Sequence, residues 1–132
     1  MPFFLWGSMF DHEKFEVYKR GIQFIVLANK VSGELPEGNG YLVDQLRRAS
    51  SSILLNIAEG AGEYASSEKG TFYRMAKRSA TECAGIQDVC KNLELIGEDP
   101  YKGLREMLVE IVSMLIKMAK MAELGRGREK KS

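Results

Sequence analysis

The fold is decided by residues 45–60, QLRRASSSILLNIAEG. Small and apolar side chains recur around this stretch in alternating steps of three and four, which is the period of one face of an α-helix. The inward face comprises Leu42, Leu46, Ala49, Ile53, Asn56 and Gly60. An unpaired buried polar group costs about 1–3 kcal/mol. The stretch therefore predicts a helix whose inward amide, Asn56, has a specific partner.

Three further segments have the same helical period, and glycine or proline residues separate them. The inward positions of the first, about Asp11 to Ser32, are Phe15, Tyr18, Ile22, Ile25 and Asn29. Those of the third, which begins at Ser66 or Ser67, are Phe72, Ala76, Ser79, Cys83, Ile86, Cys90, Leu93 and Gly97. Those of the fourth, which begins at Asp99-Pro100, are Leu104, Leu108, Ile111, Leu115, Met118 and Ala122.

These segments predict an all-α fold, because no window of the sequence alternates polar and apolar residues over the length of a strand. The connections are short, so consecutive helices are expected to be antiparallel. The prediction is an up-down-up-down four-helix bundle over residues 11–124. Residues 1–10 are expected to form a flexible apolar extension, and residues 125–132 a disordered basic tail.

Composition and charge limit the kinds of partner. The 132 residues carry 19 basic and 18 acidic side chains, a net charge of +1, so a nucleic-acid site must be a local patch. No run of about 18 apolar residues occurs, and the apolar opening lacks a basic n-region, so we expect neither a membrane span nor a signal peptide. Cys83 and Cys90 would lie about 10 Å apart on one helix. They are expected to be free thiols in a cytoplasmic protein.

The sequence offers little for catalysis or for a cofactor. Its one histidine, His12, is near the start of the first helix, so a di-metal site with inward Glu-x-x-His pairs is not expected. The same lack of a placed histidine argues against Ser-His or Cys-His catalysis. The two cysteines are too far apart for a zinc pair of the usual spacing. We therefore expect no catalytic residue, no metal and no cofactor.

A set of polar residues on the second and third helices has two interpretations. Its members are Arg48, Asn56, Glu59, Ser79 and Glu82. They could form a hydrogen-bonded network that fixes the register of the two helices. Alternatively, Glu59 and Glu82 could be the carboxylate pair of an active site. We favour the network, because no nucleophile or metal-ligand set accompanies the carboxylates.

Two further surfaces are candidates for binding. The basic residues Arg47, Arg74, Lys77 and Arg78 could contact phosphates, with Lys69 nearby, although a solvated helix face is the alternative. On the fourth helix a second apolar stripe runs beside the inward one. It comprises Val109, Val112, Ile116 and Ala119. No helix is central in a four-helix bundle, so this stripe predicts a subunit interface, with a wide core face as the alternative.

At Gln45–Ala49, Asn56–Gly60 and Ala76–Glu82 the sequence resembles a bacterial family of four-helix bundles. This family includes proteins encoded in intervening sequences of large-subunit ribosomal RNA genes and the accessory variability determinant of diversity-generating retroelements. The resemblance covers roughly Phe10 to Leu124. It implies a homopentameric barrel without enzymatic activity and, for the retroelement members, binding to a reverse transcriptase and to RNA or DNA. The role of the intervening-sequence members is not established.

From this resemblance we expect an accessory scaffold that binds a reverse transcriptase and its RNA. The alternative within the family is a self-assembling structural protein without a nucleic-acid partner. A third hypothesis is an enzyme that uses Glu59 and Glu82.

Overall fold

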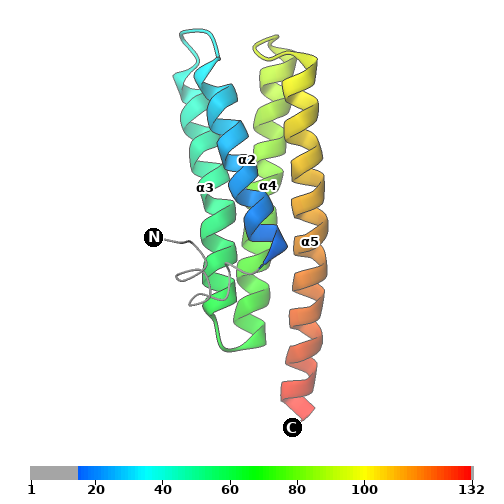
Figure 1. Ribbon diagram of the computed structural model, residues 1–132. Helices are drawn as coiled ribbons and strands as arrows, with labels where there is room; N and C mark the ends of the chain where they lie inside the picture. Colours follow the sequence, from blue (N-terminus) through cyan, green and yellow to red (C-terminus); the bar gives the residue numbers. More distant parts are fainter. Residues whose placement is uncertain (1–14, 132) are drawn as a thin grey trace, which may run out of the picture.

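Four α-helices form an elongated bundle in the computed structural model (Figure 1). The structure describes residues 15–131, with side chains as far as Gly125, and it contains no strand within that range. The helices are α2 (Glu16–Gly33), α3 (Gly40–Gly62), α4 (Ser66–Asn92) and α5 (Glu98–Lys131). The prediction of an all-α four-helix bundle is confirmed. The expected extension over residues 1–10 lies outside the described residues.

The helices do not have equal lengths, and this shapes the bundle. α4 packs along both α3 and α5, whereas the shorter α2 makes less extensive contacts with α3 and α5. In Figure 1, α2 stops short of the end at which α3 turns into α4. Of the described helices, only α3, α4 and α5 therefore form that end of the bundle.

The inward positions predicted for α3 and α5 are correct. All six on α3, from Leu42 to Gly60, are buried. On α5, Met118 is half-buried and the other five predicted positions are buried. In α4, Ala76, Cys83, Ile86 and Cys90 are buried as predicted, and Phe72 and Ser79 are half-buried. The prediction is wrong for Leu93 and Gly97, which lie beyond the end of α4 and are exposed. The buried apolar side chains of all four helices form a single core.

The inward face predicted for α2 is wrong. Ile22 is 43% exposed and Asn29 is exposed as well, while Phe15, Tyr18 and Ile25 are only half-buried. The buried residues are instead Val17, Gly21, Phe24, Ala28, Val31 and Ser32. A Cβ placed on Gly21 would lie 2.7 Å from Leu54 Cδ2, so α2 and α3 approach closely at this glycine. α2 carries apolar residues on two faces, and the face with the small residues is the one that permits this approach.

Two helix ends also differ from the prediction. α4 ends at Asn92, because Glu94 takes a left-handed conformation (φ 60°) and Leu95 N–H donates to the Cys90 carbonyl over 2.8 Å. α5 continues as helix to Lys131, whereas the sequence predicts a disordered tail over residues 125–132. That segment contains no proline, and its Arg, Lys and Glu residues are good helix formers. Basic residues also suit the negative end of a helix dipole.

Candidate partner-binding surfaces

A short polar network joins α3 to α4. The Ser79 hydroxyl donates to the Ser52 hydroxyl over 2.9 Å. Asn56 Nδ2 donates to the backbone carbonyl of Ser52 at 2.9 Å and to its hydroxyl at 3.1 Å. Asn56 is 9% exposed, so its amide is paired where it is buried. The predicted network therefore exists for Asn56 and Ser79, with Ser52 as the member that connects them.

Ser52 was missed in the sequence because the three consecutive serines 50–52 gave no reason to select one. A signal was available, since Ser52 lies four residues before Asn56 and therefore on the same helix face. Ser50, in contrast, is buried and donates to the Arg47 carbonyl within its own helix.

The charged residues assigned to this network do not belong to it. Arg48, Glu59 and Glu82 are all exposed, and none makes a hydrogen bond or ion pair with another of the described side chains. The prediction that they are paired in the network is wrong. Their long side chains reach water from the edge of the α3–α4 contact, which avoids the cost of burying a charge.

The turn between α3 and α4 is held by Lys69. Its ammonium group donates to the Gly60 carbonyl at 3.3 Å and to the Ala61 carbonyl at 3.0 Å. These carbonyls belong to the last turn of α3, where intrahelical donors are lacking. Lys69 therefore caps a helix and is not a free member of the basic cluster. Nearby, the pKa of Glu63 is raised above 4.5, because its protonated carboxyl can donate a hydrogen bond to Glu68, and desolvation and the negative charge of Glu68 act in the same direction.

Gly60 allows α3 to touch α4 at this turn. A Cβ on Gly60 would lie 2.7 Å from Tyr73 Cε1 and 3.0 Å from Phe72 Cβ. Tyr73 is buried, and the desolvation of its ring hydroxyl raises the pKa of that group. The glycine that ends the Asn56–Gly60 motif is thus required by packing.

The predicted basic residues do not form one patch. Arg74, Lys77 and Arg78 lie on the exposed face of α4, and Arg74 pairs with Glu123 of α5 at 3.5 Å. Lys77 and Arg78 make no ion pair with the described residues. Arg47 lines a groove between α2 and α3. The structure therefore brings together only the three α4 residues.

The second apolar stripe of α5 lies at the surface of this subunit. Val109 is 55% exposed, and Val112, Ile116 and Ala119 are half-buried. A groove of about 260 Å³ runs beside it between α4 and α5, where Ala80 and Ala84 supply short side chains. On the flank of α5 that faces α2, Arg20 binds Glu110 through both carboxylate oxygens, at 2.6 and 3.1 Å. The stripe thus borders the hollow beside α4, away from this ion pair.

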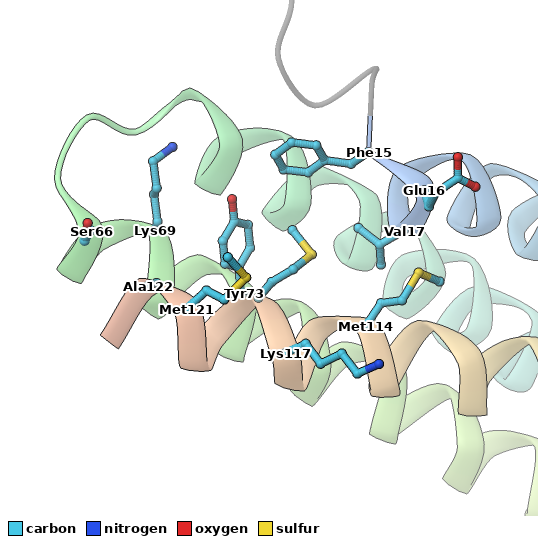
Figure 2. Close-up of a pocket in the computed structure, with 11 residues that line it drawn as sticks. Phe15, Glu16, Val17, Ser66, Lys69, Tyr73, Met114, Lys117, Met121 and Ala122 are labelled. Atoms are coloured by element: carbon cyan, nitrogen blue, oxygen red, sulfur yellow. The ribbon is translucent and has the colours of Figure 1, made fainter. Parts of the chain in front are cut away.

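A larger apolar cavity, of about 570 Å³, opens beside the first turn of α2 (Figure 2). Its apolar lining includes Phe15, Tyr73, Met114, Met118, Met121 and Ala122. The sequence alone does not indicate this cavity, because its methionines occupy inward or neighbouring positions of α5 and resemble ordinary core residues.

Metal-binding and membrane-spanning features are not found in the part of the chain that the structure describes. Residues 15–131 contain no group of three or more His, Cys, Asp or Glu side chains placed to share a metal ion. Within the same range, no helix combines the length and the apolar character needed to cross a bilayer. The described cysteines, Cys83 and Cys90, are buried free thiols, as predicted.

The fold and its surfaces define a class: an antiparallel four-helix-bundle protein with a partly exposed apolar stripe beside a small-residue groove. The chain belongs to the 23S rRNA-intervening sequence protein family, whose sequence profile matches residues 13–117. This confirms the family expected from residues 45–60 and 76–82.

A crystal structure of similar fold is known for a protein from Bacteroides thetaiotaomicron. That protein is described as having unknown function and as coming from the S23 ribosomal protein family. The two structures align with a TM-score of 0.73 and 21% sequence identity, over 79% of this chain and 98% of the other. A search of curated proteins gives no match to this chain. The likeness therefore supports the fold.

Proposed function

We propose that the protein is a non-enzymatic scaffold that assembles into a homo-oligomer and binds RNA or DNA together with a reverse transcriptase. The observation on which the assembly rests is the apolar stripe Val109, Val112, Ile116 and Ala119, in which Val109 is exposed and the other three are half-buried beside a groove. Apolar side chains left partly exposed at helical spacing are typical of packing between subunits. The pentameric barrel is the assembly that the family resemblance implies.

The groove extends the stripe into one apolar face, because Val109 and Val112 line it together with Ala80 and Ala84 of α4. Apolar side chains of a neighbouring subunit could fill the room that the alanines leave. A ring follows if a different face of that neighbouring subunit packs here. Such a ring would repeat the basic face of α4 once in each subunit.

The assembly can be tested by light scattering on two matched variants. Val109→Glu should yield monomers, because it places a charge in the proposed interface. Val26→Glu is the control, since Val26 is similarly exposed but lies on α2. A monomeric wild-type protein, or an oligomer that survives Val109→Glu unchanged, would contradict the assembly.

The nucleic-acid partner is supported by Lys77 and Arg78, whose exposed charges are not neutralised by a described acidic residue. Contacts to phosphates release counterions, so binding should weaken as salt is raised. Lys77→Glu with Arg78→Glu should weaken RNA binding and flatten its salt dependence. Lys30→Glu with Lys102→Glu changes the net charge equally at exposed positions elsewhere and should have a smaller effect.

The proposal that the partner is a reverse transcriptase comes from the family resemblance. It predicts that the oligomer co-purifies at low salt with a reverse transcriptase encoded beside its gene. Absence of association at low salt would remove this partner without affecting the assembly.

A second candidate is a self-assembling structural protein that binds no nucleic acid. The Arg74–Glu123 pair and the net charge of +1 favour it, because they reduce the charge available to phosphates. RNA binding that is absent at low salt, with the oligomer intact, would select this candidate. The enzyme hypothesis has less support, because Glu59 and Glu82 are exposed and line none of the cavities described above.

A further inference from the structure

The apolar cavity beside α2 lies towards the end of the bundle that α2 does not reach. α2 begins at Glu16 (Figure 1), and beyond its first turn the cavity is bounded by α4 and α5 (Figure 2). Its volume of about 570 Å³ falls in the range of sites that hold a small ligand or a few side chains.

The lining of the cavity suits aromatic side chains. Met114, Met118 and Met121 follow one another at helical spacing on α5, and all three line it. Met121 is 71% exposed, which leaves an apolar side chain of the cavity in contact with water. Methionine is flexible, and its sulfur makes favourable contacts with aromatic rings. The charged groups that line the cavity are Lys69, Lys117 and Glu16.

An occupant with matching chemistry is encoded just before the cavity. Residues 1–14 precede Phe15 and include the apolar run Phe3-Phe4-Leu5-Trp6. Phe15 itself lines the cavity, so this run is tethered at the cavity wall. The residues between Trp6 and Phe15 can span about 30 Å when extended, which is ample for a return to the cavity. Gly7 within this connection permits the chain to reverse direction.

We propose that residues 3–6 dock into this cavity of their own subunit and cover the methionines of α5. The segment supplies the apolar cover that α2 does not extend far enough to provide. Its aromatic rings would lie against Met118 and Met121, and the acidic residues Asp11 and Glu13 of the connection would pass the lysines of the cavity.

The single tryptophan, Trp6, makes the docking directly measurable in the intact protein. Its emission should lie at shorter wavelength than in the denaturant-unfolded chain, and acrylamide should quench it several-fold less. Met121→Glu should shift the emission to longer wavelength and restore quenching. Met75→Glu is the matched control, because Met75 is an exposed methionine of α4 outside the cavity. It should leave Trp6 protected.

Phe3→Ser with Phe4→Ser gives a second variant that leaves the bundle untouched, and it should also expose Trp6. Trp6 as accessible in the native protein as in the unfolded chain would overturn the proposal. An equal response to Met121→Glu and Met75→Glu would overturn it too.

Mixed oligomers show whether residues 3–6 dock into the cavity of their own subunit or into that of a second copy. Met121→Glu chains, which carry Trp6, are refolded together with Trp6→Phe chains, which have an intact cavity. Trp6 should stay exposed in this mixture. Recovery of its protection would overturn docking within one subunit and show that the segment crosses to a second copy.

Discussion

Ser52 of α3 accepts a hydrogen bond from the Ser79 hydroxyl of α4 over 2.9 Å, and the same Ser52 hydroxyl accepts one from Asn56. One side chain thus connects the buried amide of α3 to the neighbouring helix. Sliding either helix by one turn would break the Ser79–Ser52 hydrogen bond, whereas Asn56 would keep its bonds to Ser52 within α3. The Ser79–Ser52 bond therefore favours one register between two helices whose small inward residues would tolerate others.

Removing the interhelical hydroxyl should destabilise the fold modestly. Ser79→Ala loses one hydrogen bond to Ser52, so the free energy of unfolding should fall by about 1 kcal/mol. Ser52→Ala should cost more, because Asn56 Nδ2 also loses an acceptor. Chemical denaturation of both single variants and of the double variant measures the coupling. Ser113→Ala is the control, since this exposed serine bonds only to the Val109 carbonyl of its own helix.

Gly60→Ala should be strongly destabilising, whereas Gly85→Ala should not. The new Cβ at position 60 would meet Tyr73 Cε1 at 2.7 Å and Phe72 Cβ at 3.0 Å, and a Cβ is fixed to its backbone, so α3 and α4 would have to move apart. Overpacking of this kind typically costs about 1–3 kcal/mol. At Gly85, also within a helix, a Cβ meets nothing within 4 Å. Alanine there should stabilise the protein by up to about 1 kcal/mol. Equal effects of the two variants on thermal unfolding would refute this account.

Glu63→Gln should stabilise the protein at neutral pH. The pKa of Glu63 is raised above 4.5 by the hydrogen bond and charge of Glu68, so the folded state holds this proton more tightly than the unfolded state. The associated stability is present below pH 4.5 and is lost as the pH rises through the folded-state pKa. The melting temperature of the variant should exceed that of the wild type at neutral pH, with a smaller difference in acid. Glu106→Gln, at an exposed position of α5, is the matched control for the removal of one negative charge.

Cys83 should resist alkylation in the folded protein. Burial, with the nearby charge of Glu82, raises its pKa to about 12, so the thiolate that reacts is scarce and also inaccessible. Burial raises the pKa of the Cys90 thiol as well. Labelling with iodoacetamide should therefore follow the rate of unfolding and accelerate with added denaturant. A cysteine introduced at the exposed position 77 should react rapidly under native conditions. Equally rapid reaction of the native thiols would show that the core opens locally.

The sequence predicted α3 and α5 well, because each carries apolar residues at helical spacing and the structure buries that face. It failed on α2, where two apolar faces compete and close contact at Gly21 with Leu54 selects the one with smaller residues. Periodicity ranks side chains by polarity, but it contains no information about how closely two helices can approach.

The partners of polar residues were harder to predict than the helices. Asn56 and Ser79 were correctly assigned to one network, but the connecting residue is Ser52. Lys69 was grouped with the basic residues by charge alone, while in the fold it reaches back to the carbonyls of Gly60 and Ala61. Such contacts depend on the geometry of a turn, which residue types and spacing do not specify.

Because α2 is short, we expect it to unfold locally at a lower free energy than the other three helices. α3, α4 and α5 bury most of the core between them, whereas α2 is attached by a smaller contact and by the solvent-exposed Arg20–Glu110 pair. Regions with fewer buried contacts open at lower free energy than the whole fold. The amide protons of α2 should therefore exchange through a partial unfolding in which the other three helices persist. The bundle then consists of three helices, α3, α4 and α5, that stay packed together, and of α2, which separates from them at a lower free energy.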